Sequence, residues 1–319
     1  MAVPVSESAL VRGAREAQRP SRWWIGWLVV FLGGVIAINI AVEPAARALL
    51  GDPATGSPKA QWVELFTNAA TLAVVAAWVC LKERRPFASL GFRGTHRLAS
   101  LAGGFAAGAG MLALGVLVLT LTGQYDTHGS AHTTSGAAAL GTVLPLLIVW
   151  IVQASTEETV TRGYMLQTAA SQIRGPLAVA LVAVVLAVAH VDLRPLVLLN
   201  IVLFSLMASF LSLARGSLWI AIGVHIGWNA FQGNVFGLPV SGNPYGASLW
   251  TFGPTTGSDT WITGSDFGIE GGIVTTLIWG AATVLAYAYW RRAGRRAPLE
   301  VPASGTSSRT RPAGEPGAV

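Results

Sequence analysis

The feature that most constrains this chain is a series of long apolar runs separated by short polar segments. A helix of about 20 apolar residues crosses the ~30 Å hydrocarbon layer of a membrane. Because only 11% of the 319 residues are charged, against about 25% in soluble domains, the sequence predicts an all-α, polytopic membrane helix bundle. We expect about eight transmembrane helices, at about 22–42, 60–81, 98–122, 140–157 (continuing as a more polar helix), 175–190, 195–214, 217–237 and 271–290.

The basic residues predict how these helices are oriented. If all eight runs span, 18 of the 21 lysines and arginines fall on one side, and Arg47, Lys59 and Arg194 fall on the other. Basic loop residues favour the cytoplasm, so we expect both termini to be cytoplasmic. Arginine far outnumbers lysine, which is compatible with a GC-rich genome and therefore with an integral protein of a bacterial plasma membrane. The basic residues are dispersed between apolar runs, so a lipid bilayer is the expected partner and nucleic acid is not. The sequence leaves the oligomeric state open.

Composition also predicts the domain boundaries. Residues 1–20 and 295–319 are rich in Pro, Ser, Arg and Ala and show no apolar periodicity, so we expect disordered tails. The membrane domain would then cover 21–294, with its polar motifs in about 140–236. The stretch 238–270 is rich in Gly, Pro, Ser and Thr and contains neither Lys nor Arg. We expect a long outer loop there, and loops of this length are often lids or binding elements.

Charged residues interrupt the fourth run in the sequence STEETVTRG. Ionisable side chains inside membrane helices usually face one another or a water-filled cavity. Glu158 and Arg162 are four residues apart, so they lie on one helix face and can form a supporting ion pair. Glu157 lies about 100° around the helix from Glu158 and is left without an obvious partner. We therefore expect Glu157 to point into a polar chamber inside the bundle.

Two further polar positions lie in later runs. His190 ends the fifth run, and a helical hairpin turning near Arg174 would place it at nearly the depth of Glu157, because the two residues lie 16 and 17 positions from the turn. His225 and Asn229 are one turn apart on the seventh run and share a face. Each residue alone has a structural interpretation, since His and Asn often bond neighbouring membrane helices. Together they predict a shared catalytic site.

These motifs resemble those of the CPBP intramembrane proteases, a family that includes type II CAAX prenyl endopeptidases and Abi-type bacteriocin self-immunity proteins. The family pattern is EExxxR, FxxxH and HxxxN. Here the pattern is EETVTR at 157–162, LAVAH at 186–190, with Leu186 in place of Phe, and HIGWN at 225–229. The resemblance covers about residues 80–290. It implies an intramembrane endopeptidase acting on a membrane-associated peptide or protein. Glu157 and His190 would activate water, and His225 and Asn229 would stabilise the oxyanion.

The chemistry leaves several alternatives open. We expect no metal, but Glu157, His190 and His225 are a possible two-histidine, one-carboxylate Zn²⁺ site with water as the fourth ligand. The zinc-protease motif HExxH is absent from the sequence. A proton-coupled transporter would also need a buried Glu and His. A non-catalytic immunity or scaffold protein is a further alternative.

Overall fold

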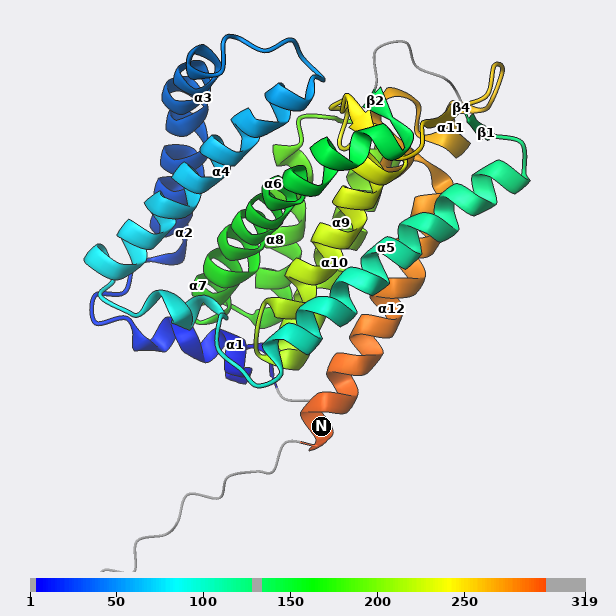
Figure 1. The fold of residues 1–319 in the computed structure, drawn as a ribbon. Helices are drawn as coiled ribbons and strands as arrows, with labels where there is room; N and C mark the ends of the chain where they lie inside the picture. Colours follow the sequence, from blue (N-terminus) through cyan, green and yellow to red (C-terminus); the bar gives the residue numbers. More distant parts are fainter. Residues whose placement is uncertain (1–3, 128–133, 297–319) are drawn as a thin grey trace, which may run out of the picture.

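The computed structural model describes residues 4–127 and 134–296, which form a bundle of helices (Figure 1). Helix α10 lies at its centre and packs against α5, α6 and α9, while α4 packs on α6, and α12 and α8 both pack on α9. Helices α2 and α3 lie beside α4 at one edge of the bundle. The helices are α1 (Ala9–Arg12), α2 (Trp23–Trp27), α3 (Ala37–Leu49), α4 (Pro58–Ala77), α5 (Arg97–Leu121), α6 (Leu140–Glu158), α7 (Gln167–Ala170), α8 (Gly175–Ala189), α9 (Pro195–Arg215), α10 (Trp219–Ala230), α11 (Thr260–Thr263) and α12 (Ile273–Arg296).

Five helical segments of the described chain are long and apolar enough to cross a membrane. They are Pro58–Lys82, Arg97–Leu121, Gly136–Ala170, Pro195–Arg215 and Ile273–Ala293. The predicted count of about eight is not confirmed. Helix α8 has 15 residues, or about 22 Å of helix, and α10 has 12 residues before a π-helical turn at Phe231–Val235. The first predicted run begins as α2 and continues through a π-helical stretch, Leu28–Ile36, into α3.

Glycines bring α5 and α10 into backbone contact. A Cβ added at Gly108 would lie 2.1 Å from the Val224 carbonyl oxygen, and one added at Gly227 would lie 2.1 Å from the Phe105 carbonyl oxygen. Gly104 and Gly223 make equally close approaches to the facing helix. Both helices therefore carry a GxxxG pattern, which lets membrane helices pack at short range. On α10 this pattern brackets His225 and fixes the position of its helix.

The N-terminal segment is folded onto the bundle, so the prediction of a disordered tail over 1–20 is wrong for its described part. Val5–Glu16 forms short helical turns that bury Leu10 and Val11. The segment packs against glycines of the bundle, with Ala9 against Gly216 and Val5 against Gly175. The domain therefore begins before residue 21. At the other end, Arg296 ends α12, and the rest of the predicted tail at 295–319 lies outside the described residues.

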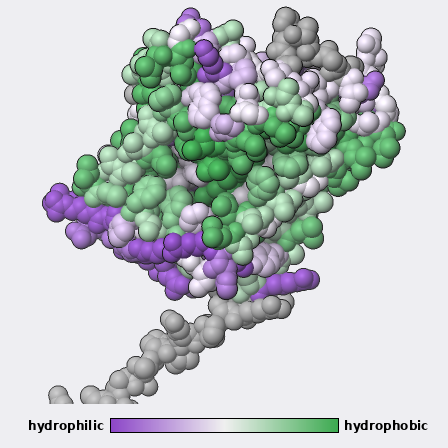
Figure 2. All heavy atoms as spheres, viewed as in Figure 1, coloured by the Kyte–Doolittle hydropathy of each residue, from purple (hydrophilic) through white to green (hydrophobic). Residues whose placement is uncertain are grey.

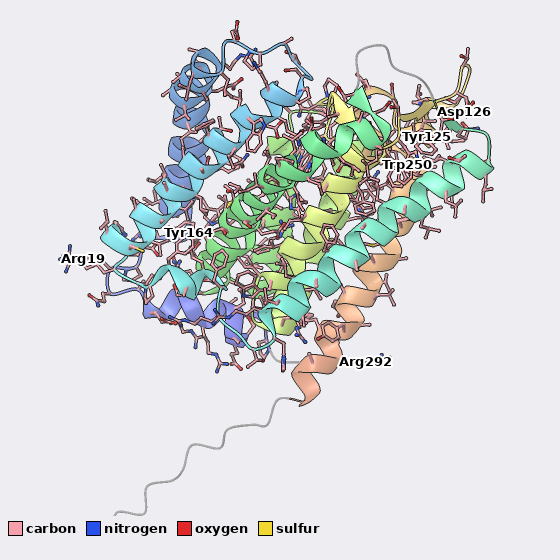
Figure 3. All side chains as sticks on the ribbon, in the orientation of Figure 1. Arg19, Tyr125, Asp126, Tyr164, Trp250 and Arg292 are labelled. Atoms are coloured by element: carbon pink, nitrogen blue, oxygen red, sulfur yellow. The ribbon has the colours of Figure 1, made fainter. Side chains whose placement is uncertain are left out.

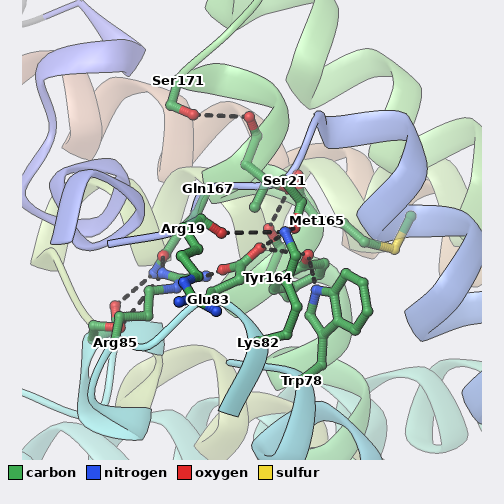
Figure 4. A network of polar contacts seen from close by, with 12 residues as sticks. Arg19, Ser21, Trp78, Lys82, Glu83, Arg85, Tyr164, Met165, Gln167 and Ser171 are labelled. Atoms are coloured by element: carbon green, nitrogen blue, oxygen red, sulfur yellow. Dashed lines mark hydrogen bonds and ion pairs between the residues drawn. The ribbon is translucent and has the colours of Figure 1, made fainter. Parts of the chain in front are cut away.

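A buried polar network holds together the end of the bundle on which the N-terminal segment lies (Figure 4). Glu83, just after α4, accepts hydrogen bonds from Ser21 Oγ and Tyr164 Oη at 2.9 Å and from Arg85 Nε at 2.9 Å. Arg85 also donates to Gln167 Oε1 at 2.8 Å. The network therefore ties the N-terminal segment and the end of α4 to the chain that follows α6.

The loop 238–270 lies at the opposite end of the bundle, above the central helices in Figure 1. It is not purely irregular, because β3 (Ala247–Ser248) pairs with β2 (Thr134–Ser135), and β4 (Phe252–Pro254) pairs antiparallel with β1 (Tyr125–Thr127). Two small sheets therefore qualify the all-α prediction for a chain that is otherwise mostly helical. The loop is anchored to α9 by Asn200, which donates to the Glu270 and Gly272 carbonyls.

The surface has two distinct ends. Figure 3 places Arg19 and Arg292 towards one end of the bundle, and Tyr125 and Trp250 towards the other. Hydrophilic residues gather at the first of these ends in Figure 2, whereas apolar residues cover much of the sides of the helices. The N-terminal segment and the C-terminal end of α12 share the hydrophilic end. The five long apolar helices make the protein an integral membrane protein.

Candidate active site

A cavity of about 310 Å³ lies between the central helices and the 238–270 loop. Glu157 from α6, His190 from the end of α8, and His225 and Asn229 from α10 all line it. Val240, Ser241 and Tyr245 of the loop contribute to the same cavity, which therefore lies towards the loop end of the bundle. The structure brings together all four residues predicted to form the site.

A chain of four charged or titratable side chains leads to the cavity wall. Arg162 Nη1 donates to Glu158 Oε1 at 3.0 Å, and both side chains are completely buried. The same Glu158 oxygen lies 3.0 Å from His225 Nδ1. The other ring nitrogen, Nε2, lies 3.8 Å from Glu157 Oε2. The predicted Glu158–Arg162 pair is therefore present. Glu158 balances the buried charge of Arg162 and also orients the ring of His225.

The helix changes pitch just after these carboxylates. Residues Thr159–Leu166 form π-helical turns, and every one of them is buried. Such turns are rare and occur often at functional sites, because the extra residue per turn redirects side chains. Arg162 lies within this stretch, above the ring of Phe204 at 5.5 Å. The widened turn therefore places the guanidinium in the interior between α6 and α9.

Glu157 has two neighbours, which corrects the prediction that it lacks a partner. Besides His225, it accepts a hydrogen bond from Gln153 Nε2 at 2.7 Å, one helical turn earlier. Gln153 Oε1 in turn accepts from Asn229 Nδ2 at 3.1 Å. Gln153 thus positions both residues, and its i, i+4 spacing from Glu157 was a signal that the sequence reasoning missed. The Glu157 side chain remains 32% exposed to the cavity and its mouth.

His190 reaches the cavity by a different route. It follows Ala189, the last residue of α8, and its Nδ1 donates to the Leu186 carbonyl oxygen at 2.8 Å. This bond assigns the ring proton to Nδ1 and leaves Nε2 as the acceptor of the neutral imidazole. Among the contacts of the described residues, none joins His190 directly to Glu157. The space between them belongs to the cavity that both residues line.

The alternative zinc site would need its three ligands close together. In residues 4–127 and 134–296, no three His, Cys, Asp or Glu side chains are grouped closely enough to hold a metal ion. Glu157, His190 and His225 therefore do not form a three-ligand site in this conformation. His225 also has its Nδ1 committed to Glu158, which leaves only Nε2 for any further ligand.

Comparison with protein families gives one match. The model of the type II CAAX prenyl endopeptidase Rce1-like family matches residues 139–231. This segment is similar to the domain of that family. The match confirms the resemblance inferred from the motifs and indicates protease activity in the membrane. No curated protein and no solved structure shows significant similarity to the chain. The Rce1-like segment runs from the start of α6 to the end of α10 and contains all four predicted site residues.

Two cavity carboxylates lie outside the Rce1-like segment, and the sequence reasoning missed both. Glu64 on α4 accepts from Tyr245 Oη at 3.0 Å. Glu270, just before α12, accepts from Trp228 Nε1 at 3.1 Å and from the Ser241 backbone N–H at 2.8 Å. Burial raises the pKa of the Glu270 carboxyl group. A glutamate inside the apolar run at 60–81 was the available signal for Glu64, whereas only tertiary folding brings Glu270 to the cavity.

Proposed function

We propose that this protein is an intramembrane endopeptidase that hydrolyses a peptide bond of a membrane-associated peptide or protein in the cavity. One observation carries the proposal. Three separate helices of the Rce1-like segment place Glu157, His190, His225 and Asn229 around one cavity, and the buried Glu158 fixes the orientation of His225. A structural ion pair alone would not require the other three polar side chains to face the same space.

The proposed reaction begins with a water molecule between Glu157 and His190. Glu157, the general base, takes a proton as the water oxygen attacks the peptide carbonyl carbon. The oxyanion that forms accepts hydrogen bonds from His225 Nε2–H and from the second N–H of Asn229, whose amide has two donors. Collapse of the tetrahedral intermediate breaks the C–N bond, and the proton held by Glu157 passes to the departing amine. For both His225 nitrogens to donate, the ring must be an imidazolium, with Glu158 as its counter-ion.

We propose that this reaction uses no metal. The absence of a three-ligand cluster from the described residues supports this. We further propose a bacterial plasma membrane location with both termini cytoplasmic. The asymmetry of the basic residues supports that orientation, as does the shared end of the N-terminal segment and α12. The loop 238–270 and the mouth of the cavity would then lie towards the outer face.

The test is cleavage of quenched fluorescent peptides by the detergent-purified protein. The variant Glu157→Gln should lower kcat/KM by about 10²–10⁴-fold, the usual contribution of general base catalysis. Glu43→Gln is the matched control, because Glu43 on α3 does not line the cavity, and it should retain activity. A zinc chelator should leave the rate unchanged. Equal activity of Glu157→Gln and the unaltered protein would refute the assignment of the base, and loss of activity with the chelator would refute the metal-free mechanism.

A further inference from the structure

The cavity contains more carboxyl groups than the proposed reaction uses. Three carboxylates line it, Glu64, Glu157 and Glu270, and none of its lining residues is a lysine or an arginine. The nearest arginine on the catalytic helix, Arg162, is already paired with Glu158. Among the described cavity residues, only histidines are available to balance these carboxylates. A substrate that supplied a positive charge would therefore complement the cavity better than a neutral one.

The wall next to Glu270 is aromatic. Trp228, which donates to Glu270 Oε1, packs against Trp279 with the rings tilted by 50° and their centroids 4.7 Å apart. The centroid of the Trp279 ring lies 5.2 Å from that of Phe204. All three rings line the cavity. Aromatic faces beside a carboxylate accommodate the hydrocarbon stem of Lys or Arg and attract its charged end. The surroundings of Glu64 differ, because its carboxylate accepts a hydrogen bond from the hydroxyl of Tyr245.

A second observation points to a ligand at the same wall. Trp279 is 3% exposed, and within the described structure its buried Nε1–H has no hydrogen-bond partner. Buried N–H donors are nearly always satisfied, so an unpartnered one in a cavity wall indicates an acceptor supplied by a ligand or by water. A peptide carbonyl oxygen is such an acceptor. Trp279 and Glu270 line the same cavity. The donor and the carboxyl group therefore match two groups of a single residue, its backbone carbonyl and its basic side chain.

We propose that Glu270, Trp228 and Trp279 form a subsite for a lysine or arginine side chain of the substrate peptide. The inference rests on the proposed function, since it assigns the substrate class of the same cavity. Glu270 Oε1 accepts one bond from Trp228 and has capacity for a second donor. Ser241 holds the other oxygen with its backbone N–H and hydroxyl, so the carboxylate is fixed before the cation arrives.

Peptide binding tests the subsite without requiring turnover. Dye-labelled peptides that differ only by Lys or norleucine at one scanned position are titrated against the Glu157→Gln protein, with fluorescence anisotropy as the readout. At one position, Lys should bind at least about tenfold tighter than norleucine or acetyl-lysine, the factor expected for one hydrogen bond to a charged group. Adding Glu270→Gln should reduce that ratio to below about threefold. Adding Glu64→Gln to the Glu157→Gln protein instead, which removes one carboxylate from the same cavity, should leave most of the preference for Lys over norleucine.

Two further measurements complete the test. Trp279→Phe should weaken the binding of the Lys and norleucine peptides by the same factor, because it removes a hydrogen-bond donor to the peptide backbone and not to the peptide side chain. Carbodiimide coupling of the peptide lysine should attach it to Glu270, as mapped by mass spectrometry, even if Glu270→Gln does not fold. Equal binding of Lys and norleucine peptides, a preference that survives Glu270→Gln, or coupling to Glu64 would each overturn the proposal. Binding without hydrolysis would refute the proposed function alone, and hydrolysis without basic preference would refute the subsite alone.

Discussion

Replacing Gly108 on α5 by alanine should separate the two helices that position His225. The added Cβ would lie 2.1 Å from the Val224 carbonyl oxygen, whereas ordinary contact begins at 3.4 Å. The backbones therefore have to move apart by about 1.3 Å, because neither contacting group can rotate away. Overpacking of this kind costs about 1–3 kcal/mol. A displacement of about 1 Å at a catalytic group can lower activity about 10²-fold, and Val224 immediately precedes His225.

Gly110→Ala is the matched control, because it lies on the same helix and its added Cβ would have no atom within 4 Å. Both variants change helix propensity by the same amount, so the difference between them isolates the helix contact. The free energy of unfolding is measured in detergent from tryptophan fluorescence, and kcat/KM from peptide cleavage. Gly108→Ala should be less stable and less active than Gly110→Ala. If the two variants are equally stable and active, the close approach of α5 and α10 does not position the site.

Other parts of the fold give further predictions. Glu83→Gln should cost about 3–5 kcal/mol in thermal unfolding, because it leaves Arg85 buried without its counter-ion, whereas Glu16→Gln on an exposed pair should cost no more than about 1 kcal/mol. Equal effects would contradict the burial argument. Leu10→Asp should release the N-terminal segment and speed its cleavage by protease while α4 to α12 stay resistant; unchanged cleavage would mean that Leu10 does not anchor it. The hydrogen bond from Arg93 holds the pKa of Glu16 below its usual 4.5. The Glu16–Arg93 ion pair, which also fastens the N-terminal segment, is therefore complete above pH 4.5 and weakens as the pH falls further. Cleavage in the Glu16→Gln variant should lack that acid dependence.

The sequence predicted the parts of the site that depend on spacing within one helix or one hairpin. The Glu158–Arg162 pair follows from i, i+4 geometry. The common cavity of Glu157 and His190 follows from their nearly equal distances from the turn at Arg174. Their catalytic roles stay predictions. The contact of Glu157 with His225 depends on how α6 and α10 cross, which periodicity does not specify. The GxxxG patterns on α5 and α10 were a readable signal for that crossing.

Other differences arose because burial can come from contacts between distant segments. The N-terminal segment lacks apolar periodicity, yet Leu10 and Val11 are buried, and glycines of the bundle lie against Val5 and Ala9 of the same segment. The count of about eight spans is not confirmed because hydropathy measures composition and not helix length: α8 ends at Ala189, and α10 gives way to π-helical turns after Ala230. The two small sheets pair residues more than 100 positions apart in sequence, beyond the reach of local pattern analysis.

The cavity combines two groups of residues with different origins. The four proposed catalytic residues lie within the Rce1-like segment, on α6, α8 and α10. The carboxylates Glu64 and Glu270, and the unpartnered donor of Trp279, come from α4, the loop and α12, outside that segment. Chemistry common to a family constrains the first group, because a base and an oxyanion donor serve any peptide bond. In the proposed reaction, the second group would face the variable side chains of a substrate. Under the two proposals, selectivity is therefore expected to change with α4, the loop and α12, and the proposed hydrolytic step with α6, α8 and α10.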